Sequence, residues 1–130
     1  QMLAVEAARI ERLKRRLGIY LVKVAAESAQ ALPRRSMDLQ INESVRSALS
    51  MGLKLEASFR RWTYLMHISQ GRVGRQSEVL AFIRDGKTPP HMETSGKPVP
   101  GNPDARMKAA FEQTIAYFQR SGSNPSGGNI

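Results

Sequence analysis

The sequence contains no cysteine and only two histidines, His67 and His91, among its 130 residues. Without cysteine, the chain cannot form disulfides, cysteine-ligated zinc or iron–sulfur sites, or a thiolate nucleophile. The two histidines have no third ligand at a usable spacing, and the sequence patterns of zinc proteases, serine hydrolases and P-loop proteins do not occur. We therefore expect a non-enzymatic protein with no metal site, no cofactor and no small-molecule substrate.

Long apolar runs are also lacking. The longest nearly uncharged apolar run extends from Leu17 to Val22, far short of the roughly 20 residues that a membrane-spanning helix needs. A signal peptide, with its basic segment, apolar run and cleavage site in order, is not found. We expect no membrane insertion and a cytoplasmic location, which would be nucleoid-associated if the protein binds DNA.

Acidic residues are scarce relative to basic ones, with 11 Asp and Glu against 20 Lys and Arg, and the formal net charge is +9. Such a charge attracts phosphate, anionic lipid and acidic protein surfaces. A small basic domain with clustered arginines is typical of nucleic-acid binding. We expect a nucleic-acid-binding protein, with DNA favoured over RNA, that acts as a regulator or as an accessory factor in a DNA-processing complex. The alternative is a helical adaptor or structural subunit of a larger assembly with acidic partners.

Hydrophobic periodicity predicts a mainly all-α domain with about four to five helices. The first helix is expected to run from residue 1 to about 32, where Pro33 ends it. Asn102, Pro103 and Asp104 supply an N-cap, a first-position proline and a first-turn acid for the last helix. Between them, helices are expected over residues 43–51, 53–69 and 78–85, the last with Ser77 as its N-cap.

The chain divides by composition into four parts. Residues 1–86 are predicted to form the helical core domain, and residues 87–102 a connector rich in proline and glycine. Residues 103–120 are predicted to form a C-terminal helix that packs on the core or on a partner. Residues 121–130 form a polar tail rich in glycine and serine.

The stretch "PRRSMDLQINESVRSALSMG" allows two interpretations. Residues 37–41 alternate apolar and polar side chains, which predicts a short extended segment followed by a helix with Asn42 as its N-cap. This order of an extended segment and two helices resembles the ribbon-helix-helix repressors. The resemblance implies a ribbon of two chains that lies in the major groove of DNA, with Asp38 and Gln40 facing outward. The same five residues also fit a polar elbow between two helices.

The candidate phosphate contacts are arginines, because guanidinium groups neutralise backbone phosphates and release counterions. They fall into three clusters: Arg12 and Arg16; Arg34 and Arg35; and Arg60, Arg61, Arg72 and Arg75. The third cluster is favoured, since Gly71 and Gly74 predict a turn whose backbone amides can approach a phosphate. The alternative for this turn is a plain helix-to-helix connection with solvated arginines.

Aromatic and apolar residues predict the core and a contact surface. Phe59 and Trp62 lie on the apolar stripe of their helix and are predicted to be core residues, whereas the position of Tyr64 is left open. Around Ile19 and Val22 the first helix is apolar on several sides, which predicts a homo-oligomer or a subunit of a complex.

Overall fold

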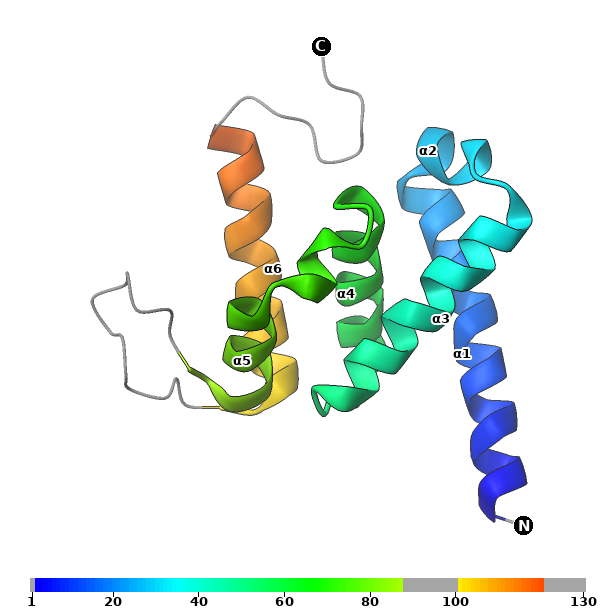
Figure 1. Ribbon diagram of the computed structural model, residues 1–130, viewed down its shortest axis with the longest axis horizontal. Helices are drawn as coiled ribbons and strands as arrows, with labels where there is room; N and C mark the ends of the chain where they lie inside the picture. Colours follow the sequence, from blue (N-terminus) through cyan, green and yellow to red (C-terminus); the bar gives the residue numbers. More distant parts are fainter. Residues whose placement is uncertain (1, 88–100, 121–130) are drawn as a thin grey trace.

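The computed structural model describes residues 2–87 and 101–120, which fold as helices without a strand (Figure 1). The elements are α1 (Met2–Val24), α2 (Ala26–Ala31), α3 (Arg34–Ser50), α4 (Glu56–Ile68), the 3₁₀ turn η1 (Arg72–Arg75), α5 (Ser77–Asp85) and α6 (Pro103–Arg120). The mainly α prediction is confirmed for these residues. The predicted connector lies outside them at residues 88–100, as does the predicted tail at 121–130, and the division into domains stays a prediction.

The helix predicted over residues 1–32 is divided at Ala25, whose φ of −140° and ψ of 51° are not helical. The chain resumes as α2, which folds over the end of α4, where Ala29 is buried and Ser28 reaches His67. Because of this division, the described part of the chain holds six α-helices rather than the predicted four to five.

The predicted extended segment at residues 37–41 is wrong. α3 begins at Arg34, directly after Pro33, and continues through the whole segment. Asn42 is therefore a residue in the middle of a helix rather than an N-cap. The ribbon implied by the resemblance to ribbon-helix-helix repressors is not formed within the described residues.

The physical reason is that apolar residues spaced by four are buried on one side of a helix, whereas the prediction relied on apolar residues spaced by two. Met37, Ile41 and Val45 recur every four residues and face the protein interior, and Ile41 and Val45 are 4% and 2% exposed. Leu39, the middle apolar residue of the alternation, is 61% exposed. The alternation was thus a coincidence of composition, and burial along one helical face decided the structure.

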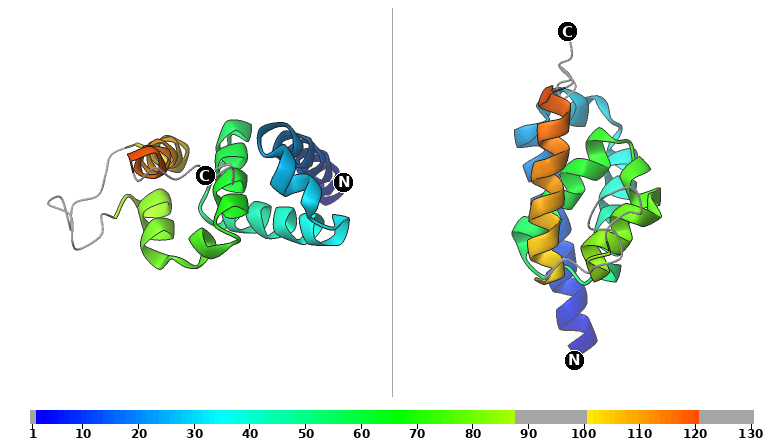
Figure 2. Two further views of the ribbon diagram at one scale, coloured as in Figure 1. Left: turned by 90° about the horizontal axis from the view of Figure 1, so that it is seen from above. Right: turned by 90° about the vertical axis from the view of Figure 1, so that its left-hand side faces the viewer.

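The helices form two layers with α4 at the centre. Seen from above, α1, α4 and α6 lie in one row, and α3, η1 and α5 lie in a second row beside it (Figure 2). α4 packs against α1, α3, α6 and η1. α4 is therefore the helix against which each of these four elements is positioned.

The core is built around α4. Phe59 and Trp62 are 4% and 0% exposed, so the prediction that they are core residues is confirmed. Tyr64, which the sequence left open, is 8% exposed and packs edge-on against Phe111 of α6, with the ring centroids 6.0 Å apart. Other helices add buried residues to the same cluster: Leu17, Leu21, Ile41, Val45, Ala48, Ile83 and Met107.

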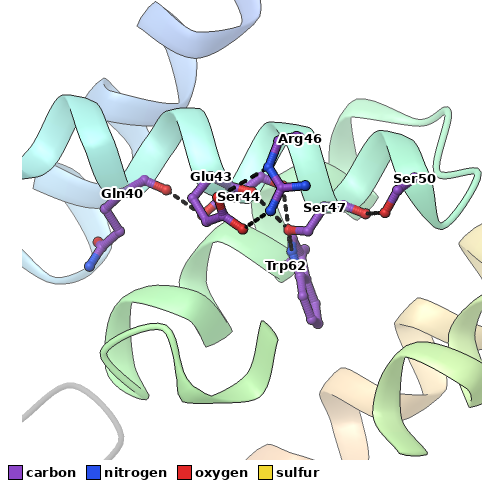
Figure 3. A network of polar contacts seen from close by, with 7 residues as sticks. All are labelled: Gln40, Glu43, Ser44, Arg46, Ser47, Ser50 and Trp62. Carbon is purple, nitrogen blue, oxygen red and sulfur yellow. Dashed lines mark hydrogen bonds and ion pairs between the residues drawn. The ribbon is translucent and has the colours of Figure 1, made fainter. Parts of the chain in front are cut away.

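The indole of Trp62 is fully buried, so its N–H needs an acceptor inside the protein. Nε1 donates to Ser47 Oγ at 2.8 Å, and the Ser47 hydroxyl donates to the backbone carbonyl of Glu43 at 2.9 Å (Figure 3). The hydroxyls of Ser44 and Ser50 also donate to carbonyls of the preceding turn of α3. These short side chains satisfy their own polar groups and let α4 lie close to α3.

Two side chains of α6 hold it in place, and the first is Asp104. Its Oδ1 accepts hydrogen bonds from the N–H groups of Lys54 and Leu55, at 3.1 and 3.0 Å, just before α4 begins. Burial raises the pKa of Asp104, but this effect is outweighed by groups that stabilise the charged carboxylate. They are the nearby Ser58 hydroxyl, which falls short of a full hydrogen bond, the two N–H groups and the Lys54 charge. The pKa therefore lies below its ordinary value, and the charged carboxylate joins the starts of α6 and α4.

The second is Arg106, which is 7% exposed. Its guanidinium donates to the carbonyls of Ile83, Arg84 and Gly101 at 3.0, 2.9 and 2.8 Å. The first two are carbonyls that the end of α5 leaves without helical partners. Arg106 therefore stabilises the packing of α6 on α5 and adds little to the charge of the surface.

His67 joins three helices. Its Nδ1 lies 2.7 Å from Gln40 Oε1 on α3, and its Nε2 lies 2.8 Å from Ser28 Oγ on α2. Because Gln40 Oε1 can only accept, Nδ1 carries the proton, and Nε2 of the neutral ring accepts from the Ser28 hydroxyl. Burial lowers the pKa of His67 below its ordinary value, which favours this neutral form.

Replacing Ser47 by alanine should leave the buried indole N–H without an acceptor. An unsatisfied buried donor costs about 1–3 kcal/mol, so the free energy of unfolding measured in urea should fall by that amount. Ser50→Ala is the matched control on the same helix, because that side chain is exposed and bonds only to a backbone carbonyl. We expect its effect to stay within about 0.5 kcal/mol. Equal losses in the two variants would contradict the role given to Ser47.

The low pKa of His67 predicts a dependence of stability on pH. As the pH falls through about 6.5, the unfolded chain protonates this histidine while the folded chain keeps it neutral. The free energy of unfolding should therefore decrease from about pH 7 to pH 5 more steeply in the natural protein than in His67→Gln. Urea unfolding at several pH values measures this difference, and parallel curves would show that the folded and unfolded pKa values are the same.

Candidate nucleic-acid interface

The turn that carries Arg72 and Arg75 closes onto the end of α4. Gly71 has a φ of 82°, in the left-handed region that favours glycine, and its N–H donates to the Met66 carbonyl at 2.8 Å. The N–H of Val73 donates to Oγ of Ser69 at 3.1 Å. The turn predicted from Gly71 and Gly74 is confirmed, and it takes the form of the 3₁₀ turn η1.

Gly74 lies in close contact with the core. A Cβ at this position would lie 2.9 Å from Sδ and 3.2 Å from Cε of Met66, so the flexible end of that side chain would have to shift to admit it. The same Cβ would lie 4.0 Å from Cζ2 of Trp62. Glycine therefore lets η1 pack directly on buried side chains of α4 without displacing them.

Arg72 and Arg75 are exposed, and neither makes an ion pair with a carboxylate of the described residues. α5 follows directly, and its first turn has no side-chain cap. Gln76 precedes the helix and Ser77 is its first residue, so the predicted N-cap was one residue too late. Two cations and the positive end of a helix dipole thus lie together at this turn.

Arg16 and Arg60 are held by a carboxylate. Nε of Arg16 lies 3.1 and 3.0 Å from the two oxygens of Glu56, and Arg60 lies 3.5 Å from one of them. The hydrogen bond from Arg16 and the charges of both arginines lower the pKa of Glu56, against the opposing effect of burial. Arg60 also lies 6.0 Å above the ring of Tyr20. These contacts join α1 to α4 and reduce the positive charge available on this edge.

Arg12 of α1 and Arg61 of α4 have no carboxylate partner among residues 6–87 and 101–116, whose side chains are described. Arg12 is exposed and Arg61 is half-buried. Burial raises the pKa of Tyr20 above its ordinary value, and the charges of Arg60 and Arg61 oppose this increase. Arg61 therefore lies near enough to Tyr20 to act on its hydroxyl.

Arg34 and Arg35 begin α3 and are exposed, and the described carboxylates form no ion pair with either. Arg34 also lines an open groove of about 380 Å³ between α1 and α3. Both signs of charge line the rest of the groove, on Glu11, Lys14, Arg15 and Asp38, beside the uncharged Ile41 and Asn42.

The structure places the eight predicted arginines in three locations. Arg72 and Arg75 lie on η1, and Arg34 and Arg35 lie at the start of α3, two elements of the same layer (Figure 2). The others lie on α1 and α4, with Arg16, Arg60 and Arg61 at the edge between these helices and Arg12 on the outer side of α1. The pairing of Glu56 with Arg60 has the spacing of four residues that a sequence reveals, whereas its pairing with Arg16 joins residues 40 positions apart.

Comparison with known proteins gives no relative: no family model, no curated protein and no solved structure matches the chain. In the described ranges, 2–87 and 101–120, none of the helices has the length and apolar character needed to cross a membrane. The same residues hold no group of three or more His, Asp or Glu side chains placed to bind a metal ion.

Proposed function

We propose that this protein is a non-enzymatic nucleic-acid-binding protein, with DNA favoured, and that η1 is its main contact with phosphate. The observation that carries this proposal is the exposure of Arg72 and Arg75 on a turn that packs on the core at Gly74. A turn already held in place binds an anion without the entropic cost of ordering a mobile loop. The role that fits is a DNA-binding regulator or an accessory factor in a DNA-processing complex.

The remaining arginines are expected to contribute unequally. Arg34 and Arg35 are exposed at the start of α3 without an ion pair to a described carboxylate, and they are expected to add a separate contact with phosphate. Arg16 and Arg60 contribute less, because phosphate has to compete with Glu56 for them. Contacts of this kind fix the position of the protein on a nucleic acid but do not read its bases, so we expect a strong dependence of the affinity on salt.

A helical adaptor is the second candidate function. It is favoured by Ile19 and Val22 of α1, which are 64% and 42% exposed. The same two side chains give a physical basis to the prediction of a homo-oligomer or of a subunit in a complex, since another chain would remove them from water. The arginines beside them on the same side of α1 favour a different protein over a second copy.

Salt-dependent binding tests the proposed function. We expect the protein to bind duplex DNA at low salt, more tightly than RNA, with an affinity that falls steeply as salt is added. The double variant Arg72→Glu/Arg75→Glu should bind more weakly and with a salt slope lower by about one to two units, because each lost phosphate contact removes close to one released counterion. Its fold should persist, since exposed turn substitutions cost under about 0.5 kcal/mol. Fluorescence anisotropy at several salt concentrations measures the affinity for duplex DNA, single-stranded DNA and RNA, and the salt slope of each.

The double variant Arg12→Glu/Arg15→Glu is the control, because it changes the net charge by the same amount on a different helix. Its salt slope should stay closer to that of the natural protein. If this pair abolishes binding while the η1 pair leaves affinity and slope unchanged, the contact lies on α1. Absence of binding to all three nucleic acids at low salt would refute the proposed function itself.

A further inference from the structure

The side of α1 that faces away from the core carries a continuous stripe. Its members are separated alternately by four and three residues, the spacing by which one helix packs along another. The stripe consists of Ala8, Arg12, Arg15, Ile19 and Val22, all exposed, and Arg15 also lines the groove between α1 and α3. Leu17 and Leu21, on the opposite side of the helix, are fully buried. The N-terminal half of α1, which begins the stripe, projects past the other helices (Figure 1).

The stripe has a cationic half and an apolar half. Arg12 and Arg15 lie within one turn of each other, and no ion pair joins them to a described carboxylate. Ile19 and Val22 occupy the next turn and are 64% and 42% exposed. Single exposed apolar residues need no explanation, but here two adjoin in one stripe with two cations. A surface of this kind matches a helix that carries acidic and apolar side chains in the same order.

A second copy of α1 does not match the whole of this stripe. In a parallel pair, Arg12 would face Arg12 and Arg15 would face Arg15. In an antiparallel pair centred on Arg15, two arginines again meet, and a shift by one turn places arginines against Ile19 and Val22. An antiparallel pair centred between Ile19 and Val22 joins the apolar halves but leaves the arginines without a carboxylate of the stripe to face. Opposed like charges, and charges buried against apolar groups, are both unfavourable.

We infer that the stripe on α1 is the docking surface for an amphipathic acidic helix of another protein. Asp or Glu of that helix would pair with Arg12 and Arg15, and its Leu, Ile or Val would cover Ile19 and Val22. An anionic membrane would also attract the arginines, but two apolar side chains offer little area for insertion. A nucleic acid would gain nothing from the apolar half. This inference develops the adaptor function and is independent of phosphate binding at η1.

The experiment uses the full chain and a fluorescein-labelled helical peptide as the probe. The peptide carries Glu, Glu, Leu and Leu at successive stripe positions, with Ala and Gln elsewhere, and is made in both orders because the helices can be parallel or antiparallel. A control peptide has Lys in place of each Glu. We expect fluorescence anisotropy to show binding of the acidic peptide and none of the Lys peptide. Arg12→Glu/Arg15→Glu should reverse this preference, which a merely unfolded or weakened protein would not do.

Ile19→Asn tests the apolar half and should weaken binding of the acidic peptide by about tenfold or more. Leu39→Asn is its matched control, because Leu39 is equally exposed, at 61%, but lies on α3. It should leave the affinity unchanged. Ile19→Asn should also leave DNA binding unchanged, so failure of this inference and failure of the nucleic-acid proposal can be told apart.

Four results would overturn the inference. The first is failure of the natural protein to bind the acidic peptide in either order. The second is peptide binding that neither the arginine reversal nor Ile19→Asn alters. The third is a dimer in sedimentation that Ile19→Asn dissociates, which would assign the stripe to a second copy. The fourth is binding to vesicles of anionic phospholipid through the same residues without binding to the peptide.

Discussion

The buried N–H of Trp62 needs an acceptor, and Ser47 supplies it at 2.8 Å. This hydrogen bond fixes α4 against α3, and α4 in turn contacts α1, α6 and η1. Met66, one turn beyond the indole, lies against the backbone of η1 at Gly74, where a side chain would displace its sulfur and methyl group. The display of Arg72 and Arg75 therefore depends on how Trp62 and Met66 pack, although neither of these side chains reaches the surface.

Positive charge is distributed unevenly over this fold, even though the sequence is basic throughout. Arg106 is buried among backbone carbonyls, and Glu56 holds both Arg16 and Arg60. The exposed arginines without a carboxylate partner in the described residues are concentrated at η1, at the start of α3 and on the outer side of α1. Net charge alone would give all of these places equal weight, whereas the ion pairs separate arginines that stabilise the fold from arginines that a partner can bind. Contact of η1 with phosphate and docking of an acidic helix on α1 are two proposals that follow from this distribution.

Local signals in the sequence predicted much of the helical framework. Gly52 and Gly86 end their helices in the left-handed conformation, and Asn102 caps α6 through a hydrogen bond to Ala105. The prediction failed at residues 37–41, because five alternating residues are too few to outweigh one buried helical face. The contacts that place α4 in the core and hold Arg16 on α1 join residues far apart in the chain, as Ser47 with Trp62 and Arg16 with Glu56 do. A single sequence shows the residue types of such pairs but not which of them meet.

The central claim is that η1 is where this protein contacts a nucleic acid. NMR tests it by following the backbone amides of the ¹⁵N-labelled chain while a short DNA duplex is added. The account predicts that the amide shifts change most at residues 71–76, with smaller changes in the first turn of α3 around Arg34 and Arg35. The amides along the outer side of α1 should change little. Shift changes confined to α1, or no changes at low salt, would contradict the account.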